Sequence, residues 1–222
     1  MNRDAMLEEM GLSPAWKLKK PADAPNAAPP ESPVASMDWD ALCETIASCT
    51  ICPLHKGRNK VVVGAGNRSA DWFFIGEAPG AEEDQQGEPF VGQAGKLLDN
   101  MLAAIGLSRQ RNVYIANTVK CRPPGNRNPE PAEMTACRPY LSRQIELVAP
   151  RLIVILGRVA AQSVLGSDAS IASLRGKRHA YGGIPVLVTY HPAYLLRNPG
   201  DKAKAWEDLC LARRLMQESE NL

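Results

Sequence analysis

Apolar residues fall into two alternating patterns along the chain. Short apolar runs typical of buried strands alternate with longer stretches in which apolar residues recur every three or four positions, as on one face of a helix. The predicted strands lie within residues 72–75, 112–121, 151–157 and 186–192, and the main predicted helices are residues 94–102, 131–148 and 158–166. This alternation favours an α/β fold whose mostly parallel sheet is covered by helices on both faces.

The densest group of chemical signals lies at residues 72–102. The predicted strand leads into a Gly-Glu-Ala-Pro-Gly turn, which is followed by an acidic loop, a lone aromatic residue, Phe90, and an amphipathic helix from Ala94. Glycine lets the backbone approach a ligand closely, and the amides of the turn and of the helix N-terminus offer hydrogen-bond donors. The stretch predicts a ligand site, although a tight turn beside a solvated acidic loop fits the same residues.

Composition narrows the class of protein. The chain has 222 residues, of which 45% are hydrophobic, enough for one domain with a full core. Its net charge of +2 does not by itself indicate a nucleic-acid-binding protein, so any basic surface must come from clustering. No apolar run approaches the ~18 residues of a membrane span, and the acidic N-terminus does not resemble a secretory signal. We expect a monomeric cytoplasmic protein that does not bind membranes.

The N-terminal part differs from the rest. Residues 1–20 carry apolar residues at the spacing of a short amphipathic helix, which would be a candidate for binding a protein partner, but they also fit an unstructured terminus. The next stretch is rich in proline and alanine and holds too little apolar surface to offset the entropy of ordering. Residues 1–37 are therefore predicted to be a disordered extension. The folded domain is expected over residues 38–222, with Asp38 or Asp40 capping its first helix.

The cysteines suggest a metal site. Cys43 and Cys210 fall on apolar helix faces, where cysteine usually behaves as a small hydrophobe. The other four lie in polar surroundings and comprise a C-x-x-C pair and two distant residues: Cys49, Cys52, Cys121 and Cys137. In a cytoplasmic chain this pattern indicates a metal site or a redox pair, but this C-x-x-C closes a helix, whereas a redox pair would open one. Four thiolates suit zinc or an iron–sulfur cluster, and the scattered ligands favour the larger cluster.

Three polar residues follow predicted strands. Glu77 comes after the first, Asn117 after the second and His191 after the last. In open α/β sheets ligands bind at the carboxyl ends of the strands, so these side chains are expected to meet at one site.

Three long segments then resemble a known family. They are GEAPGAEEDQQGEPFVGQAG, YIANTVKCRPPGNRNPEP and YHPAYLLRNP. Together with the four cysteines they resemble the family 4 uracil-DNA glycosylases, the iron–sulfur branch of their superfamily, over about residues 41–215. The resemblance implies a four-stranded parallel sheet between helices, a three-layer α/β/α fold. It also implies a [4Fe-4S] cluster, held by the four cysteines, that joins distant segments of the chain.

The same resemblance implies a reaction. Uracil would be flipped out of double- or single-stranded DNA and its N-glycosidic bond hydrolysed, leaving an abasic site. Phe90 would stack on the base, Asn117 would accept from N3–H and donate to O4, and His191 would donate to O2, where negative charge gathers. The backbone of Gly76, Glu77 and Ala78 would add contacts to the base.

The carboxylate that assists at the sugar is less clear. In the branch of the superfamily whose loop reads Gly-Gln-Asp-Pro, aspartate holds the attacking water, and this chain has Ala78 in that place. Glu77 is the first candidate for this catalytic role, Glu83 the second and Asp84 a distant third.

Residues after His191 are candidates for contacting DNA. Leu195 or Leu196 would fill the space left by the flipped base, although both leucines also fit a core role against the last helix, with Trp206, Leu209 and Leu215. Cations on this loop and on the neighbouring basic turn would bind the flanking phosphates. They are Arg197, Arg175, Lys177 and Arg178.

Two other classes of protein would share some of these features. A non-catalytic iron–sulfur DNA-binding module would need the basic loops but not Phe90, Asn117 and His191 together. A zinc-stabilised nucleotide-processing enzyme should carry a phosphate-binding motif such as G-x-x-x-x-G-K-[ST], which the sequence lacks.

Overall fold

The computed structural model describes residues 33–218. The predicted N-terminal helix, and all of the predicted extension except its last residues, lie outside that range. The described part begins with a short 3-10 helix, η1 (Pro33–Ser36), whose Val34 is buried against the core. The described part of the chain thus includes residues before Asp38, and Asp38 does cap the first α-helix by accepting from the amide of Ala41.

The sheet has six strands rather than four, in the order β1-β3-β2-β4-β6-β5. The middle four are parallel and match the four predicted strands: β2 (Trp72–Gly76), β3 (Val113–Asn117), β4 (Leu152–Leu156) and β6 (Ile184–Thr189). The two edges are antiparallel: β1 (Ala65–Gly66) pairs with β3, and β5 (Arg178–Tyr181) pairs with β6. The expectation of four strands was therefore wrong at the edges and right at the centre.

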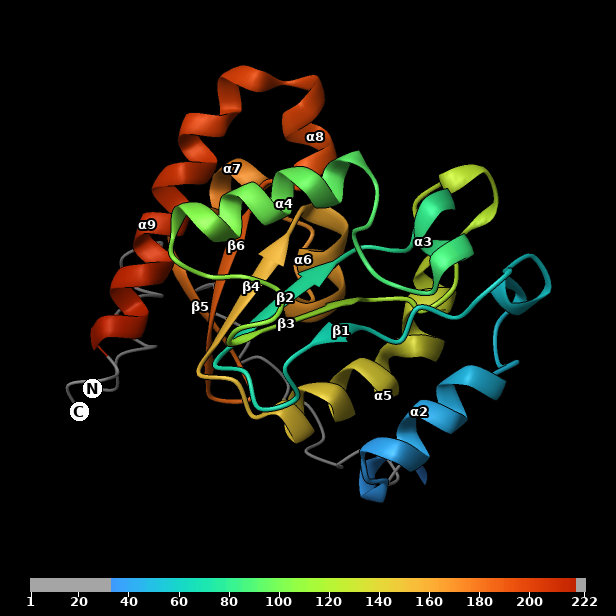
Figure 1. Ribbon diagram of the computed structural model, residues 1–222. Helices are drawn as coiled ribbons and strands as arrows, with labels where there is room; N and C mark the ends of the chain where they lie inside the picture. Colours follow the sequence, from blue (N-terminus) through green and yellow to red (C-terminus); the bar gives the residue numbers. More distant parts are fainter. Residues whose placement is uncertain (1–32, 219–222) are drawn as a thin grey trace, which may run out of the picture. The chain divides into compact units, whose positions relative to one another are not determined.

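Helices cover both faces of this sheet (Figure 1). Alternate residues of the strands point to opposite faces, so Phe74 and Val154 pack toward α4, α8 and α9, while Phe73 and Ile155 pack toward α5 and α6. A third apolar cluster joins α2 to α5 beside the cysteines. The α-helices are α2 (Trp39–Ser48), α3 (Ala81–Gln86), α4 (Gln93–Ala104), α5 (Pro131–Val148), α6 (Arg158–Leu165), α7 (Ile171–Leu174), α8 (Pro192–Arg197) and α9 (Lys202–Glu218).

Short elements account for the remaining differences from prediction. The stretch expected to be an acidic loop is the helix α3, and the segment after His191 forms the helix α8. Part of the basic turn forms α7 and β5. The remaining 3-10 helices are η2 (Pro53–Lys56), η3 (Pro124–Asn126) and η4 (Pro199–Asp201).

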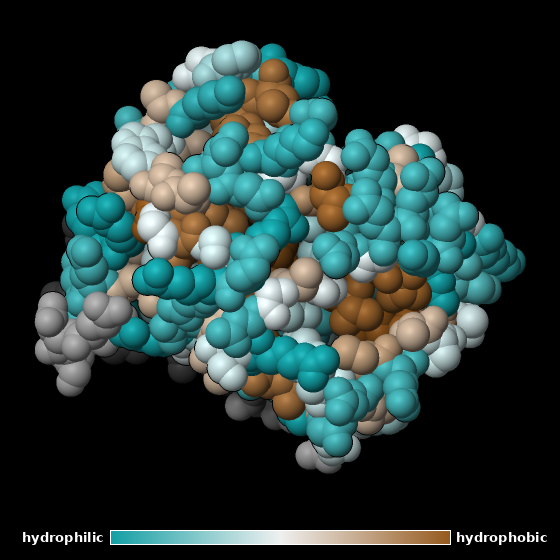
Figure 2. All heavy atoms as spheres, viewed as in Figure 1, coloured by the Kyte–Doolittle hydropathy of each residue, from teal (hydrophilic) through white to brown (hydrophobic). Residues whose placement is uncertain are grey.

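The surface seen in Figure 2 is mostly hydrophilic, and apolar residues reach it in separate patches. None of the helices within residues 33–218 has the length and apolar character needed to span a membrane.

Candidate active site

A cavity of about 580 Å³ opens where β2, β3, β4 and β6 end. Glu77, Asn117 and His191, the three polar residues predicted to meet there, all line it. The end of β4 contributes a fourth polar group, Arg158, which the sequence analysis missed. The sequence contained a sign of Arg158. The apolar run of β4 is followed by Gly-Arg, just as the other three strands are followed by polar residues.

Asn117 closes β3 with its side chain buried, 1% exposed. Its Oδ1 accepts no hydrogen bond from any of the residues that the structure describes. A buried acceptor without a partner costs about 1–3 kcal/mol, so such a group is rarely kept unless a ligand completes it. A Cβ on Gly76, its neighbour across the sheet, would lie 2.4 Å from this oxygen, so glycine at that position keeps the space beside the amide open.

The Phe90 ring forms the neighbouring wall of the cavity. It lies 5.5 Å from the His191 ring, centroid to centroid, in a stacked arrangement. Phe90 has φ of 56°, which is unusual for a bulky residue and must be imposed by its surroundings. Arg109 donates to the carbonyl of Phe90, and a Cβ on Gly95 would meet that same carbonyl at 1.7 Å. The Phe90 carbonyl therefore lies close against α4 and Arg109, which fixes the backbone that carries the ring.

Glu83 also supports this wall. Its carboxylate accepts hydrogen bonds from the amides of Gly80 (3.1 Å), Val91 (3.0 Å) and Gly92 (3.2 Å), which joins α3 to the loop that carries Phe90. Both of its oxygens are thus used within the protein, which argues against the catalytic role considered for Glu83. Asp84 is fully buried and accepts twice from Asn59, so it too has a structural role.

His191 is held as a neutral donor. It caps α8, and its Nδ1 accepts from the amide of Ala193 at 3.1 Å, so the ring proton lies on Nε2. Burial lowers the pKa of His191 to about 4, and the charge of Arg197 acts in the same direction, while Glu83 opposes it. At neutral pH the cavity therefore contains an uncharged imidazole whose Nε2–H finds no acceptor among residues 33–218.

Glu77 follows β2 at the edge of the cavity. Its backbone carbonyl accepts from the hydroxyl of Thr118 at 2.6 Å, which anchors this residue to the segment after β3. Burial raises the pKa of the Glu77 carboxyl to about 7, and the charge of Arg158 partly offsets that rise. Its carboxyl is thus poised to gain or lose a proton near neutral pH.

The four predicted metal ligands line a second, much tighter cleft, whose cavity volume is about 10 Å³. The Arg58 guanidinium donates to Cys121 Sγ at 3.1 Å. Tyr140 and Lys120 also line this cleft. Within residues 33–218, no three His, Cys, Asp or Glu side chains are arranged to hold a single metal ion. The half-buried Cys43 and Cys210 do not line this cleft.

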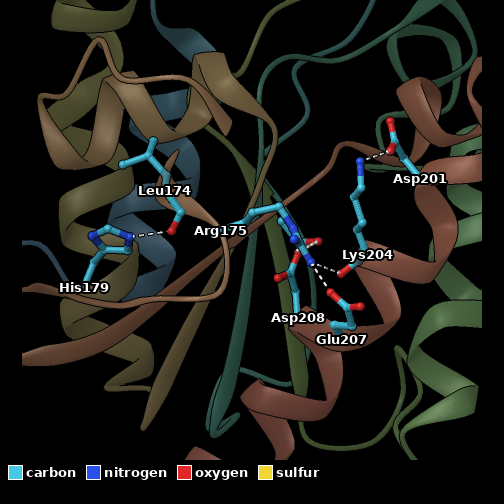
Figure 3. Close-up of polar contacts among 8 residues, drawn as sticks. Leu174, Arg175, His179, Asp201, Lys204, Glu207 and Asp208 are labelled. Carbon is cyan, nitrogen blue, oxygen red and sulfur yellow. Dashed lines mark hydrogen bonds and ion pairs between the residues drawn. The ribbon is translucent and has the colours of Figure 1, made fainter. Parts of the chain in front are cut away.

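Arg175, predicted to bind DNA phosphates, is instead tied to α9 (Figure 3). Its Nε lies 3.1 Å from the buried Asp208 carboxylate, and its second terminal nitrogen bonds to the Glu207 carboxylate (2.9 Å) and the Lys204 carbonyl. Asp208 also accepts from the Thr189 hydroxyl at the end of β6. Arg175 therefore fastens α9 to the sheet, which corrects the prediction. Other cations of the predicted phosphate-binding set are exposed: Lys177, Arg178 and Arg197.

The two leucines of α8 have different surroundings. Leu195 is 1% exposed and belongs to the core cluster between the sheet and α9, so its predicted insertion into DNA is wrong. Leu196 is 43% exposed and remains a candidate for that contact. On α9, Leu209 packs in the core and Leu215 packs against it, whereas Trp206 is exposed rather than part of the apolar face.

Comparison with known proteins identifies the family. Residues 63–210 match the family profile described as the uracil DNA glycosylase superfamily. The chain belongs to that superfamily. It is 46% identical to the type-4 uracil-DNA glycosylase of Thermotoga maritima, over 74% of this chain and 86% of that protein. It is 47% identical to the type-4 enzyme of Archaeoglobus fulgidus over 72% and 84%, and 31% identical to the type-5 enzyme of Thermus thermophilus over 70% and 87%. The predicted membership of family 4 is confirmed.

Proposed function

We propose that this uracil-DNA glycosylase superfamily member removes uracil from DNA by hydrolysing the N-glycosidic bond, leaving free uracil and an abasic site. One observation carries the proposal. In the cavity at the ends of the parallel strands, beside the Phe90 ring, the buried Oδ1 of Asn117 has no hydrogen-bond partner among residues 33–218. The type-4 relatives are named for the same activity.

Base recognition follows from the chemistry of the amide. Oδ1 of Asn117 accepts from uracil N3–H, and its amide nitrogen donates to O4. Cytosine presents an acceptor and a donor in the reverse order, so a fixed amide would leave polar groups unpaired against it. Phe90 stacks on the flipped base, which must leave the helix because its glycosidic bond is out of reach within the duplex.

Bond breaking separates charge, and the cavity has a group for each side. Negative charge gathers on uracil O2 as the base leaves, and the Nε2–H of neutral His191 donates to it. The sugar becomes cationic, and the Glu77 carboxylate stabilises it and orients the attacking water. Glu83 acts as a positioning residue that holds the Phe90 loop.

Excision should depend on pH through Glu77. Because burial raises the pKa of Glu77 to about 7, its carboxylate form increases as the pH rises through that value, while His191, with a pKa of about 4, stays neutral. We expect kcat/KM to rise between about pH 6 and 8 and then level off. Arg158→Ala should move this rise to higher pH, because it removes a cation that favours the carboxylate. An unchanged rise in Glu77→Gln would assign the pH dependence to another group.

The cysteine cleft is proposed to hold a [4Fe-4S] cluster. Four thiols that line one cleft, with a guanidinium donor directed at one of them, fit the ligand set and hydrogen bonding of such clusters. When bound, the cluster supplies a rigid link between the end of α2, the segment after β3 and the helix α5. The ligands are Cys49, Cys52, Cys121 and Cys137.

Alanine substitution tests this assignment. Replacing any of the four ligands should remove the brown colour and the broad visible absorbance of the purified protein and lower its solubility. Cys43→Ala and Cys210→Ala are matched controls and should keep full iron content. A colourless protein with one zinc ion per chain would contradict the cluster.

The exposed Leu196 is proposed to occupy the space that the flipped base vacates, while Arg197, Lys177 and Arg178 bind flanking phosphates. Leu196→Ala should slow excision from a U·A pair about tenfold more than from single-stranded DNA, because only the duplex must be held open. Leu195→Ala is the control: it removes a core side chain, so it should cost about 2–5 kcal/mol of stability and affect both substrates alike. An unchanged ratio in Leu196→Ala would place the wedge elsewhere.

The proposed activity is tested with oligonucleotides that carry a single uracil, thymine or cytosine. Anaerobically purified protein should release free base from the uracil strand alone, and alkali should then cleave that strand at the abasic site. Binding without base release, by protein with full iron content, would favour a non-catalytic DNA-binding module.

A further inference from the structure

Lys120 is a buried cation that the proposed reaction does not use. It follows β3, three residues after Asn117 and directly before Cys121, and it is only 2% exposed. Burying an ammonium group is costly unless specific partners replace its water. Its partners should therefore show what it does.

The side chain of Lys120 joins β3 to α5. Its Nζ donates to the backbone carbonyl of Asn117 at 2.9 Å and to Gln144 Oε1 at 2.6 Å. Gln144 is itself fully buried, and its Nε2 donates to the carbonyl of Val63 at 2.9 Å. The ammonium group is thus held between the end of β3 and a fixed point on α5.

The backbone of Lys120 reaches the cysteine cleft. Lys120 lines that cleft and is followed directly by Cys121, one of the four cysteines around it, and its carbonyl accepts from the amide of Val62 at 2.9 Å. One residue therefore contacts Asn117 through its side chain and borders the cysteine cleft.

The peptide bond after Asn117 is held on both sides. Its carbonyl accepts from Lys120, and its N–H, that of Thr118, donates to the carbonyl of Gly76 at 3.0 Å. Because Oδ1 of Asn117 finds no partner within residues 33–218, the direction of the amide depends on the backbone that carries it. The Lys120 contact thus helps to fix this backbone, together with the pairing of β3 to β2.

We infer that Lys120 is a positioning residue for uracil recognition, which orients Asn117 and links it to the cysteine cleft. The inference rests on the proposed function. If the ammonium group of Lys120 is removed, uracil should bind more weakly. The contacts to DNA phosphates are made by other elements and should be unaffected.

The test compares Lys120→Met, which keeps the length of the side chain but removes its donors, with the unaltered protein. Three quantities are measured: the Kd of free uracil, the Kd of duplex DNA that carries a tetrahydrofuran abasic analogue, and iron per chain. We expect uracil to bind about tenfold more weakly and kcat to fall by a similar factor or more. Abasic DNA binding and iron content should not change. Uracil binding as tight as in the unaltered protein would overturn the inference.

Two further variants separate positioning from a general loss of packing. Gln144→Met removes the other partner of the ammonium group without touching the residue beside Cys121, and should weaken uracil binding in the same direction. Tyr114→Phe removes a different buried contact to Gln144, at 3.4 Å, and should lower the melting temperature without changing uracil binding. Two outcomes would show that Lys120 stabilises the fold and does not position Asn117. One is a loss of iron in both Lys120→Met and Gln144→Met. The other is an equal weakening of uracil binding and abasic DNA binding in all three variants.

This outcome is distinct from a failure of the proposed function. If the unaltered protein does not excise uracil, the proposed function fails. If it does excise uracil and Lys120→Met binds the base normally, only the role of Lys120 is wrong.

Discussion

Asn117→Ala should lower uracil excision about 10²–10³-fold, the effect typical of removing one well-placed polar group from an active site. The fold should be unharmed. Because Oδ1 of Asn117 has no partner among the described residues, its removal breaks no bond that the structure records and relieves the burial of an unpaired acceptor. We therefore expect a melting temperature equal to or above that of the unaltered protein, measured together with single-turnover excision of a uracil oligonucleotide.

The matched control lies at the other end of the same strand. Asn112 accepts from the amide of Asp71 at 2.7 Å and donates to its carboxylate at 2.8 Å. Asn112→Ala should lower the melting temperature but leave excision per folded molecule unchanged. If Asn117→Ala instead lost stability and kept its activity, Asn117 would be a structural residue and the proposed recognition of uracil would be wrong.

Gly76→Ala should lower excision about 10²-fold or more. The added Cβ would lie 2.4 Å from Asn117 Oδ1 and 2.6 Å from the Phe90 ring, so it would push apart the amide and the stacking surface that must meet the same base. Misplacement of a reacting group by about 1 Å can cost this much in rate. Free uracil should bind more weakly for the same reason.

Gly57→Ala is the control for this substitution, because a Cβ at Gly57 would meet no atom within 4 Å. It should retain both activity and uracil binding. Full activity in Gly76→Ala would mean that the base does not lie between Asn117 and Phe90.

The sequence predicted the centre of the sheet because each middle strand is buried on both faces and appears as a short apolar run. The edges carried no such signal. β5 alternates between exposed and half-buried residues, so its Arg-His-Ala-Tyr has the sequence pattern of a basic turn, and β1 has only two residues. The convergence of Glu77, Asn117 and His191 was predictable because parallel strands end at one edge.

Other features depended on contacts between distant segments. Leu195 and Leu196 are adjacent in sequence, and only the packing of α8 decides which one is buried. Arg175 resembles Lys177 in its sequence surroundings, yet the position of α9 pairs it with Asp208. The sequence offers Glu83 as a candidate for the carboxylate that assists at the sugar, but in the fold it accepts from three backbone amides. The residue types indicated what each side chain could do, but only the tertiary packing showed which of these side chains are used for structural contacts.

The central claim is that the buried amide of Asn117 reads the N3–H edge of uracil, and competition by free bases tests it most directly. Uracil and 3-methyluracil differ at the atom that should donate to Oδ1 of Asn117. We predict that uracil inhibits excision at least about tenfold more strongly than 3-methyluracil, and that this difference disappears in Asn117→Ala. Equal inhibition of the unaltered protein by the two bases would contradict the account.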